Sequence, residues 1–329
     1  MIRPSVRFLS AAAFAVLVLS AVCGLAQTQV PTAPTAQPSA PAPAQAPTFP
    51  TPDPANFTAA SPTKDQVNAF LEASWGYDEN RVWAVEGILK TRIDGVSKVV
   101  VDVADKTNSQ QSGQITFFVM PDGKHLISSD QVIAFGDHPF ADNRALMQQR
   151  ADGPYRGAVS KDFEIVEFAD FQCPHCKEAQ ANMDKLLADF PKAHIVFENY
   201  PLESIHPQAT LAAAYADCVA KMGGSTAFFQ FAASAFDGQD GLGTADGAAL
   251  TLNSSATKVG LDPTKVAACA ATPEIKAQVQ SGIKLAQDVD VYQVPTLFVN
   301  GRQVPANIEY ATLKKIVAYQ AKIDGVAAQ

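Results

Sequence analysis

The chain lacks an excess of positive charge and has no basic stripe. Its 329 residues include 25 Lys and Arg against 33 Asp and Glu, which gives a net charge of −8. Nucleic-acid binding usually depends on clustered Lys and Arg side chains that neutralise phosphates. We therefore expect no nucleic-acid partner.

Cysteine is scarce, with five residues in the whole chain. Cys23 lies in an apolar N-terminal segment, and removal of that segment leaves Cys173, Cys176, Cys218 and Cys269. An even number in an exported chain predicts two disulfides. Zinc usually needs a second Cys or His pair at similar spacing, and c-type haem needs His where this chain has Lys177. We expect no metal and no other cofactor.

The first 60 residues are not expected to contribute to a globular core. Arg3 and Arg7 precede an uncharged apolar run that ends at Gly24-Leu25-Ala26, the pattern of a secretory signal peptide over residues 1–26. An uncleaved anchor is the alternative, because the run approaches the roughly 20 residues that span a bilayer. Residues 27–60, rich in Pro, Ala, Gln and Thr, predict a flexible linker.

Residues 61–152 contain no cysteine and are predicted to form a small α+β domain. Ser61 and Pro62 are of the types favoured at an N-cap and at the first helical position. Four apolar residues then share one helical face: Val67, Phe70, Leu71 and Trp75. Strand-like runs follow at 82–89, 98–103 and 115–119, and Gly153-Pro154 marks the expected boundary.

One stretch joins a strand, a cysteine pair and a helix. The apolar run 163–168 leads into Cys173-Pro174-His175-Cys176 and then into a helical pattern. Pro174 suits the first helical position, which puts Cys173 at the N-cap, where the helix dipole stabilises a thiolate. His175 is expected to give that thiolate a hydrogen bond or positive charge. Cys176, one turn further along, is close enough to form a disulfide with Cys173, so the pattern predicts thiol–disulfide exchange.

This stretch, the helical pattern after His206-Pro207, and Val294-Pro295-Thr296 together resemble the thioredoxin superfamily. The likeness is closest to its DsbA-like branch of exported thiol:disulfide oxidoreductases. It implies an α/β thioredoxin-like fold over residues 153–329, with a helical insertion at about 205–288. The small α+β domain precedes it.

The resemblance also implies roles for single residues. Pro295 is expected to be cis and to pack beside the disulfide, which exposes the Val294 backbone for pairing with a substrate chain. Val294 and Pro174 are therefore assigned to substrate binding. A carboxylate such as Glu167 in a buried strand is costly unless it is neutral or partnered. The family's acidic group at this position assists proton transfer to the buried cysteine, here Cys176.

Two further assignments come from relatives. Some of them carry a second disulfide in the insertion, which implies a bridge between Cys218 and Cys269; two buried free thiols are the alternative. Some have a lysine beside the buried acid, and Lys192 is the candidate for that partner here.

The predicted function is disulfide oxidation in the periplasm or cell envelope. The expected substrates are reduced or misoxidised exported polypeptides, and the resemblance implies reoxidation by a quinone-linked membrane partner of the DsbB or VKOR type. One alternative is an isomerase or reductase that dimerises through residues 61–152, although isomerases of the family usually have Thr where this chain has Val294. Another is a non-catalytic peptide-binding module with a purely structural disulfide.

Overall fold

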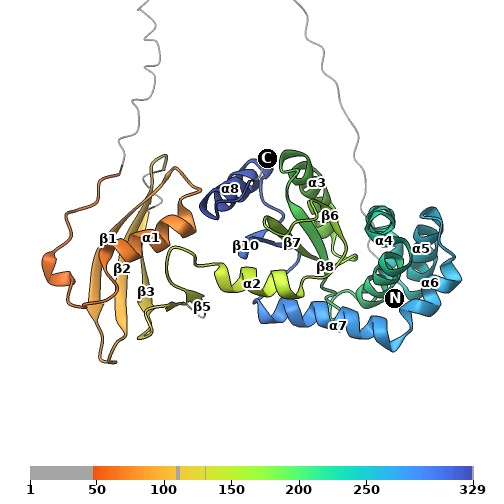
Figure 1. Cartoon of the computed structure of the whole chain (residues 1–329), viewed down its shortest axis with the longest axis horizontal. Helices are drawn as coiled ribbons and strands as arrows, with labels where there is room; N and C mark the ends of the chain where they lie inside the picture. The colour runs from red at the N-terminus through yellow and green to blue at the C-terminus, as the bar shows by residue number, and fades with distance from the viewer. Residues whose placement is uncertain (1–46, 109–111, 130, 328–329) are drawn as a thin grey trace, which may run out of the picture. The chain divides into compact units, whose positions relative to one another are not determined.

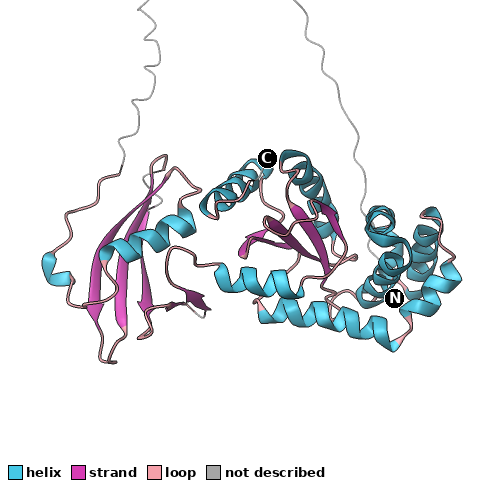
Figure 2. Ribbon diagram, in the orientation of Figure 1, coloured by secondary structure: helices cyan, strands magenta, loops and turns pink. Residues whose placement is uncertain are grey.

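The computed structural model describes residues 47–108, 112–129 and 131–327. The expected signal peptide and most of the expected linker lie outside these residues. The described elements form two separate five-stranded sheets with helices packed against them (Figures 1 and 2). Within the described residues, no helix has both the length and the apolar character needed to cross a membrane.

The first sheet is an antiparallel meander in which each strand pairs with the next along the chain. Its strands are β1 (Arg81–Lys90), β2 (Ser97–Asp105), β3 (Ser112–Val119), β4 (His125–Ser128) and β5 (Gln131–Ala134). A short 3-10 helix, η1 (Pro54–Asn56), and helix α1 (Lys64–Trp75) precede them. Alternate strand residues such as Val99, Val101 and Phe117 pack with Val67 and Leu71 of α1 into one core.

Helix α1 begins two residues later than predicted. Its N-cap is Thr63, whose hydroxyl accepts from the Gln66 backbone N–H while the Gln66 side chain accepts from the Thr63 N–H. This reciprocal pair satisfies two N–H groups that the helix start leaves free. Ser61-Pro62 is a cis peptide before the helix, so the assignment of these residues to the cap and first turn is wrong.

The second sheet has the order β10-β9-β7-β8-β6. Only the central pair β7–β8 is parallel, and the other neighbours are antiparallel. The strands are β6 (Tyr155–Gly157), β7 (Glu164–Ala169), β8 (His194–Asn199), β9 (Thr296–Val299) and β10 (Arg302–Pro305). Every residue of β7, β8 and β9 is buried, as a sheet covered on both faces requires.

Helices cover both faces of this sheet (Figure 1). Helices α3 (Pro174–Asp189) and α8 (Tyr310–Ile323) pack on one face, where Met183 and Val317 meet Ile165. Helices α2 (Ala141–Arg150) and α7 (Pro273–Asp288) pack on the other, where Met147 and Leu285 meet Phe168. The predicted α/β class is confirmed.

A group of helices separates β8 from β9 in the chain: α4 (Ala209–Asp237), the 3-10 helix η2 (Gln239–Gly243), α5 (Ala245–Lys258), α6 (Pro263–Ala270) and α7. The range of α4 contains two helical segments that meet at a kink. The first segment ends at Gly223-Gly224, where Gly224 has a non-helical backbone with a φ of 72°, and the second begins after it. The core of this group includes Phe171, Cys173 and Cys176, so the helices pack directly against the cysteine turn.

Candidate active site

The cysteine turn connects the end of β7 to the start of α3. Cys173 is the N-cap residue with an extended backbone, and Pro174 occupies the first turn. The Cys173 carbonyl accepts from the backbone N–H groups of Cys176 and Lys177 at 3.1 and 3.3 Å. Its side chain makes no capping hydrogen bond. The sulfur is therefore left at the positive end of the helix.

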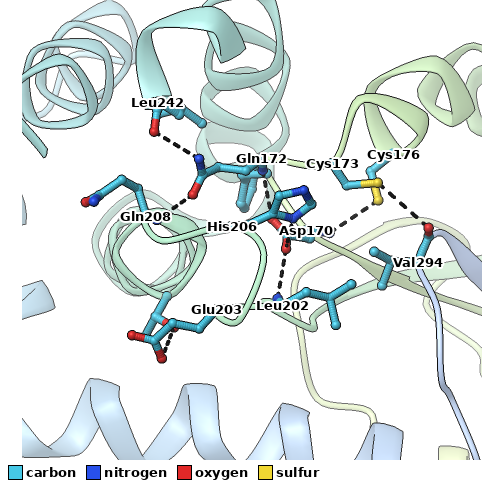
Figure 3. A network of polar contacts seen from close by, with 12 residues as sticks. Asp170, Gln172, Cys173, Cys176, Leu202, Glu203, His206, Gln208, Leu242 and Val294 are labelled. Carbon is cyan, nitrogen blue, oxygen red and sulfur yellow. Dashed lines mark hydrogen bonds and ion pairs between the residues drawn. The ribbon is translucent and has the colours of Figure 1, made fainter. Parts of the chain in front are cut away.

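The two cysteines are free thiols in this structure and differ in accessibility. Cys173 keeps 6% of its surface exposed, whereas Cys176 is completely buried. The Cys173 thiol lies 3.7 Å from the Val294 carbonyl oxygen, and the Cys176 sulfur accepts from the Asp170 backbone N–H at 3.4 Å (Figure 3). An incoming sulfur from solvent can reach only Cys173.

The two thiols also ionise differently. The hydrogen bond from the Cys176 thiol lowers the pKa of Cys173 to about 6, helped by the backbone N–H groups of Cys176 and His175 and opposed by burial and by Asp170. Burial, followed by the interaction with Cys173, strongly raises the pKa of Cys176. At neutral pH the pair therefore consists of a thiolate at Cys173 and a protonated thiol at Cys176.

His175 points toward solvent. Its side chain is 62% exposed, and Nδ1 lies 3.1 Å from Glu178 Oε2. Glu178 is the main cause of the raised pKa of His175, and the charge of Cys173 contributes less. The residue reaches the Cys173 sulfur through its backbone N–H and through charge, while its ring is hydrogen-bonded to Glu178.

Glu167 lies on β7 and is 1% exposed. Burial raises the pKa of Glu167 to about 7, although the charge of Arg156 and a hydrogen bond from Gln180 act in the opposite direction. Gln180 Nε2 lies 2.8 Å from Glu167 Oε1 and 3.3 Å from the Cys176 carbonyl, so one amide connects the acid to the cysteine turn. The prediction that Lys192 is the partner of Glu167 is wrong. Gln180 and Arg156 interact with Glu167 instead, and Lys192 lines a separate cavity with Phe163.

Val294 and Pro295 approach the turn from the loop before β9. The Val294–Pro295 peptide is cis. The Val294 carbonyl faces the Cys173 sulfur (Figure 3). The backbone of this loop thus lies at the accessible cysteine.

Cys218 and Cys269 form a disulfide apart from this pair. Their sulfurs are 2.09 Å apart and join α4 to α6. Cys218 is completely buried in the core that also contains Cys173 and Cys176. In the described part of the chain, no group of three or more His, Cys, Asp or Glu side chains could hold a metal ion.

The sequence does not single out Asp170, and it places His206 only at the start of a helical pattern. The Asp170 carboxylate is fully buried and lies 2.8 Å from His206 Nδ1 (Figure 3). Both residues follow strands of the parallel pair β7–β8, whose carboxyl ends lie at the same edge of the sheet. That placement is the signal in the sequence that predicts their contact.

A family model described as Thioredoxin matches residues 150–318. Among curated proteins, the Na(+)/H(+) antiporter NhaA 3 of Salinispora tropica is 34% identical over 162 residues, which are 47% of this chain and 23% of that protein. The chain thus spans about a quarter of the length of that relative.

Solved structures also match. A thioredoxin-like oxidoreductase from Silicibacter pomeroyi DSS-3 is 24% identical, with a TM-score of 0.46 over 54% of this chain and 98% of that one. The thiol-disulfide exchange protein alpha-DsbA2 from Wolbachia pipientis is 19% identical, with a TM-score of 0.46 over 54% of this chain and 95% of that one.

Proposed function

Because this chain belongs to the thioredoxin family, whose model matches just over half of it, we propose that it is a disulfide oxidase for exported proteins. Its α/β fold is the thioredoxin-like fold that the resemblance predicted. One observation carries the proposal: the accessible Cys173 has a pKa of about 6 while the pKa of its buried neighbour Cys176 is strongly raised. Because the two pKa values are shifted in opposite directions, the Cys173 sulfur can attack and leave as a thiolate, whereas Cys176 keeps its proton.

The exchange proceeds in two steps. A substrate thiolate attacks the Cys173 sulfur of the oxidised pair, the Cys173–Cys176 bond breaks, and Cys176 departs with the electron pair. A second substrate thiolate then attacks the substrate sulfur of the mixed disulfide, and Cys173 departs as a thiolate. The substrate loses two electrons and the cysteine pair gains them.

Glu167 has the proton that the first step needs. Cys176 is a poor leaving group because burial raises the pKa of its thiol, so its departure is helped by protonation. The pKa of Glu167 is about 7, which keeps a fraction of the carboxyl protonated at neutral pH. We assign the proton donor to Glu167.

Thiolate stabilisation sets the direction of the reaction. Lowering the pKa of Cys173 from 9.0 to about 6 stabilises the reduced pair. The effect is on the order of a few kcal/mol, since one pKa unit corresponds to about 1.4 kcal/mol. A pair that is more stable reduced passes its disulfide on.

The loop at Val294 and Pro295 is proposed to hold the substrate chain. The Val294 carbonyl lies beside the Cys173 sulfur, so an extended peptide that pairs with this backbone presents its own cysteine to Cys173. Pro174, next to Cys173 in the turn, completes this surface.

The chain is proposed to act in the bacterial cell envelope after export by residues 1–26. Its expected substrates are reduced exported polypeptides, and a quinone-linked membrane protein of the DsbB or VKOR type reoxidises the pair. With these substrates and this partner, we propose that the chain belongs to the DsbA-like branch of the family.

Refolding of a multi-disulfide substrate tests the proposal. The wild type is expected to oxidise the reduced substrate faster than it rearranges a scrambled one, and Cys173→Ser to do neither. Cys176→Ser is expected to accumulate the mixed disulfide, which non-reducing electrophoresis detects. Activity on scrambled substrate alone would favour an isomerase, and equal activity of Cys173→Ser would reject an enzyme.

A further inference from the structure

Asp170 is a buried carboxylate that the proposed exchange does not use. It stands between β7 and the cysteine turn, and its side chain has no exposed surface. Its backbone N–H donates to the Cys176 sulfur at 3.4 Å. A charged group in this position costs free energy unless hydrogen-bond donors surround it.

Three N–H donors surround this carboxylate. The Gln172 backbone N–H donates to Oδ1 at 2.7 Å, the Leu202 backbone N–H to Oδ2 at 2.8 Å, and His206 Nδ1 to Oδ2 at 2.8 Å. Two of the three come from the loop between β8 and α4 (Figure 3). The negative charge is thus held in place by the segment that leads into the helical group.

This charge acts on the reactive sulfur. Asp170 is among the causes that raise the pKa of Cys173, against the larger lowering effect of the Cys176 thiol. Other charged side chains that interact with the pair include Glu167 of β7, whose charge acts on Cys176, and His175, whose ring is hydrogen-bonded to Glu178. His206 is 17% exposed and holds the donor on the solvent side of the carboxylate.

We propose that Asp170 and His206 form a positioning pair that controls how readily Cys173 leaves as a thiolate: Asp170 orders the turn at the cost of a negative charge, and His206 screens that charge from the sulfur. This inference rests on the proposed thiol–disulfide function. It predicts effects of opposite sign when the two residues are changed, whereas a merely structural tie predicts effects of the same sign.

The test is titration of the Cys173 thiolate by its ultraviolet absorbance in the reduced full-length protein. Asp170→Asn removes the charge and is expected to lower the ionisation midpoint, while His206→Leu removes the screening donor and is expected to raise it. Each shift should be about half a pH unit or more, the size expected for a charge acting across several ångströms of protein. His206→Asn, whose amide can donate from a position like that of Nδ1, is expected to return the midpoint toward wild type.

Two controls remove other parts of the same structure. Gln239 Nε2 donates to the Phe171 and Cys173 carbonyls, so Gln239→Leu takes two uncharged hydrogen bonds from the same turn. His194 Nδ1 bonds the Ala158 carbonyl at the opposite end of β8, so His194→Gln removes a histidine far from the sulfur. Neither is expected to shift the midpoint as the pair does.

The equilibrium with glutathione gives a second measurement on the same variants. Asp170→Asn is expected to increase the ratio of reduced to oxidised pair at a fixed glutathione ratio at least about threefold, and His206→Leu to decrease that ratio by a similar factor, following the change in thiolate stability. If Asp170→Asn does not fold, the proposal is still tested by the ionisation midpoint of His206→Leu and by its return toward wild type in His206→Asn.

Shifts of the same sign in Asp170→Asn and His206→Leu, or shifts no larger than those of Gln239→Leu, overturn the inference. Neither measurement uses a protein substrate. Shifts of opposite sign in a protein that fails the refolding assay would reject the proposed oxidase and leave the positioning pair standing.

Discussion

At the scale of single residues, Glu167 and Glu198 form a natural comparison. Both are buried carboxyls on the parallel pair of strands, and burial raises the pKa of Glu167 to about 7 and that of Glu198 to about 8. Their neighbours differ. Glu167 connects through Gln180 to the Cys176 backbone, whereas Glu198 accepts from the Gly153 backbone N–H at 2.8 Å.

Glu167→Gln is expected to slow attack of a thiol substrate on the oxidised pair about a hundredfold, the lower end of the range for general acid catalysis. Glu167 is protonated below its pKa of about 7, so the wild-type rate per substrate thiolate should fall as pH rises through 7. The variant should lack this decline. Stopped-flow measurement of pair reduction between pH 5 and pH 9 provides the profile.

Glu198→Gln is the matched control for that experiment, because it removes a similar buried carboxyl that does not contact the cysteine turn. Its rate profile should follow the wild type. Equal profiles for the wild type and Glu167→Gln would remove Glu167 from the mechanism.

Glu198→Gln should also change stability in a pH-dependent way. An unfolded Glu has a pKa near 4.3, and the folded pKa is about 8. The folded state therefore holds a proton that the unfolded state releases, so this group lowers stability progressively as pH rises from about 4.5 to 8. The variant should gain on the order of a few kcal/mol over wild type at pH 8 and little at pH 5.

Urea unfolding at the two pH values measures this difference. Glu167, whose pKa is also raised by burial, titrates in both proteins, so its effect cancels in the comparison. A variant less stable by the same amount at pH 5 and pH 8 would show that the Gly153 hydrogen bond outweighs the buried charge.

At the scale of elements, the Cys218–Cys269 bridge joins α4 to α6 within the core that contains the reactive pair. It closes a segment with a sequence separation of 51 residues. Cross-linking a loop of that length restricts the unfolded chain and contributes about 4 kcal/mol in the chain-entropy model.

The double variant Cys218→Ala/Cys269→Ala is expected to lose about 2 to 4 kcal/mol of unfolding free energy, measured with urea.

In the wild type, mild reductant should open Cys173–Cys176 before Cys218–Cys269, because Cys173 is the accessible sulfur and Cys218 is completely buried. Alkylation followed by mass spectrometry reads the order. Simultaneous reduction of both bonds would argue that the first pair is only structural.

The sequence predicts elements best where local chemistry determines them. The strand before Cys173 and the helix after it follow from an apolar run and from Pro174 at the first helical position, and the structure has both. The start of α1 was misassigned because Thr63 and Gln66 form a better cap than Ser61 and Pro62. The competing cap, Thr63, lies two residues beyond Ser61 in the sequence.

Contacts between distant segments are harder to predict. Asp170 and His206 are 36 residues apart, and their bond depends on how β7 and β8 align. The partner of Glu167 was also misassigned, since Gln180 reaches it from the second turn of α3 and Arg156 acts from β6. Such partners depend on which side chains the packed sheet and helices bring together, which hydrophobic periodicity does not specify.

At the scale of the whole molecule, the described residues belong to one compact unit, and the division into domains near Gly153 stays a prediction. Arg302 of β10 links the elements that this division would separate. Its guanidinium donates to the Ser74 carbonyl at 2.7 Å and to the Ala73 carbonyl, both in α1, and its Nε donates to Gln320 of α8 at 2.7 Å. It is 5% exposed and lies 4.3 Å from the Phe140 ring centroid.

Arg302→Met is expected to lower the free energy of unfolding by about 3 kcal/mol or more, because it leaves buried carbonyl acceptors without donors. Arg302→Lys keeps the charge but lacks the planar guanidinium that reaches two carbonyls and Gln320 at once. Its free energy of unfolding should therefore fall nearly as much as that of Arg302→Met. If residues 61–152 fold as a separate domain, either change should split thermal unfolding into two calorimetric transitions. A single transition at the wild-type midpoint would mean that Arg302 does not couple α1 to the second sheet. A single transition at a lower midpoint would mean that the two sheets and their helices unfold as one cooperative unit.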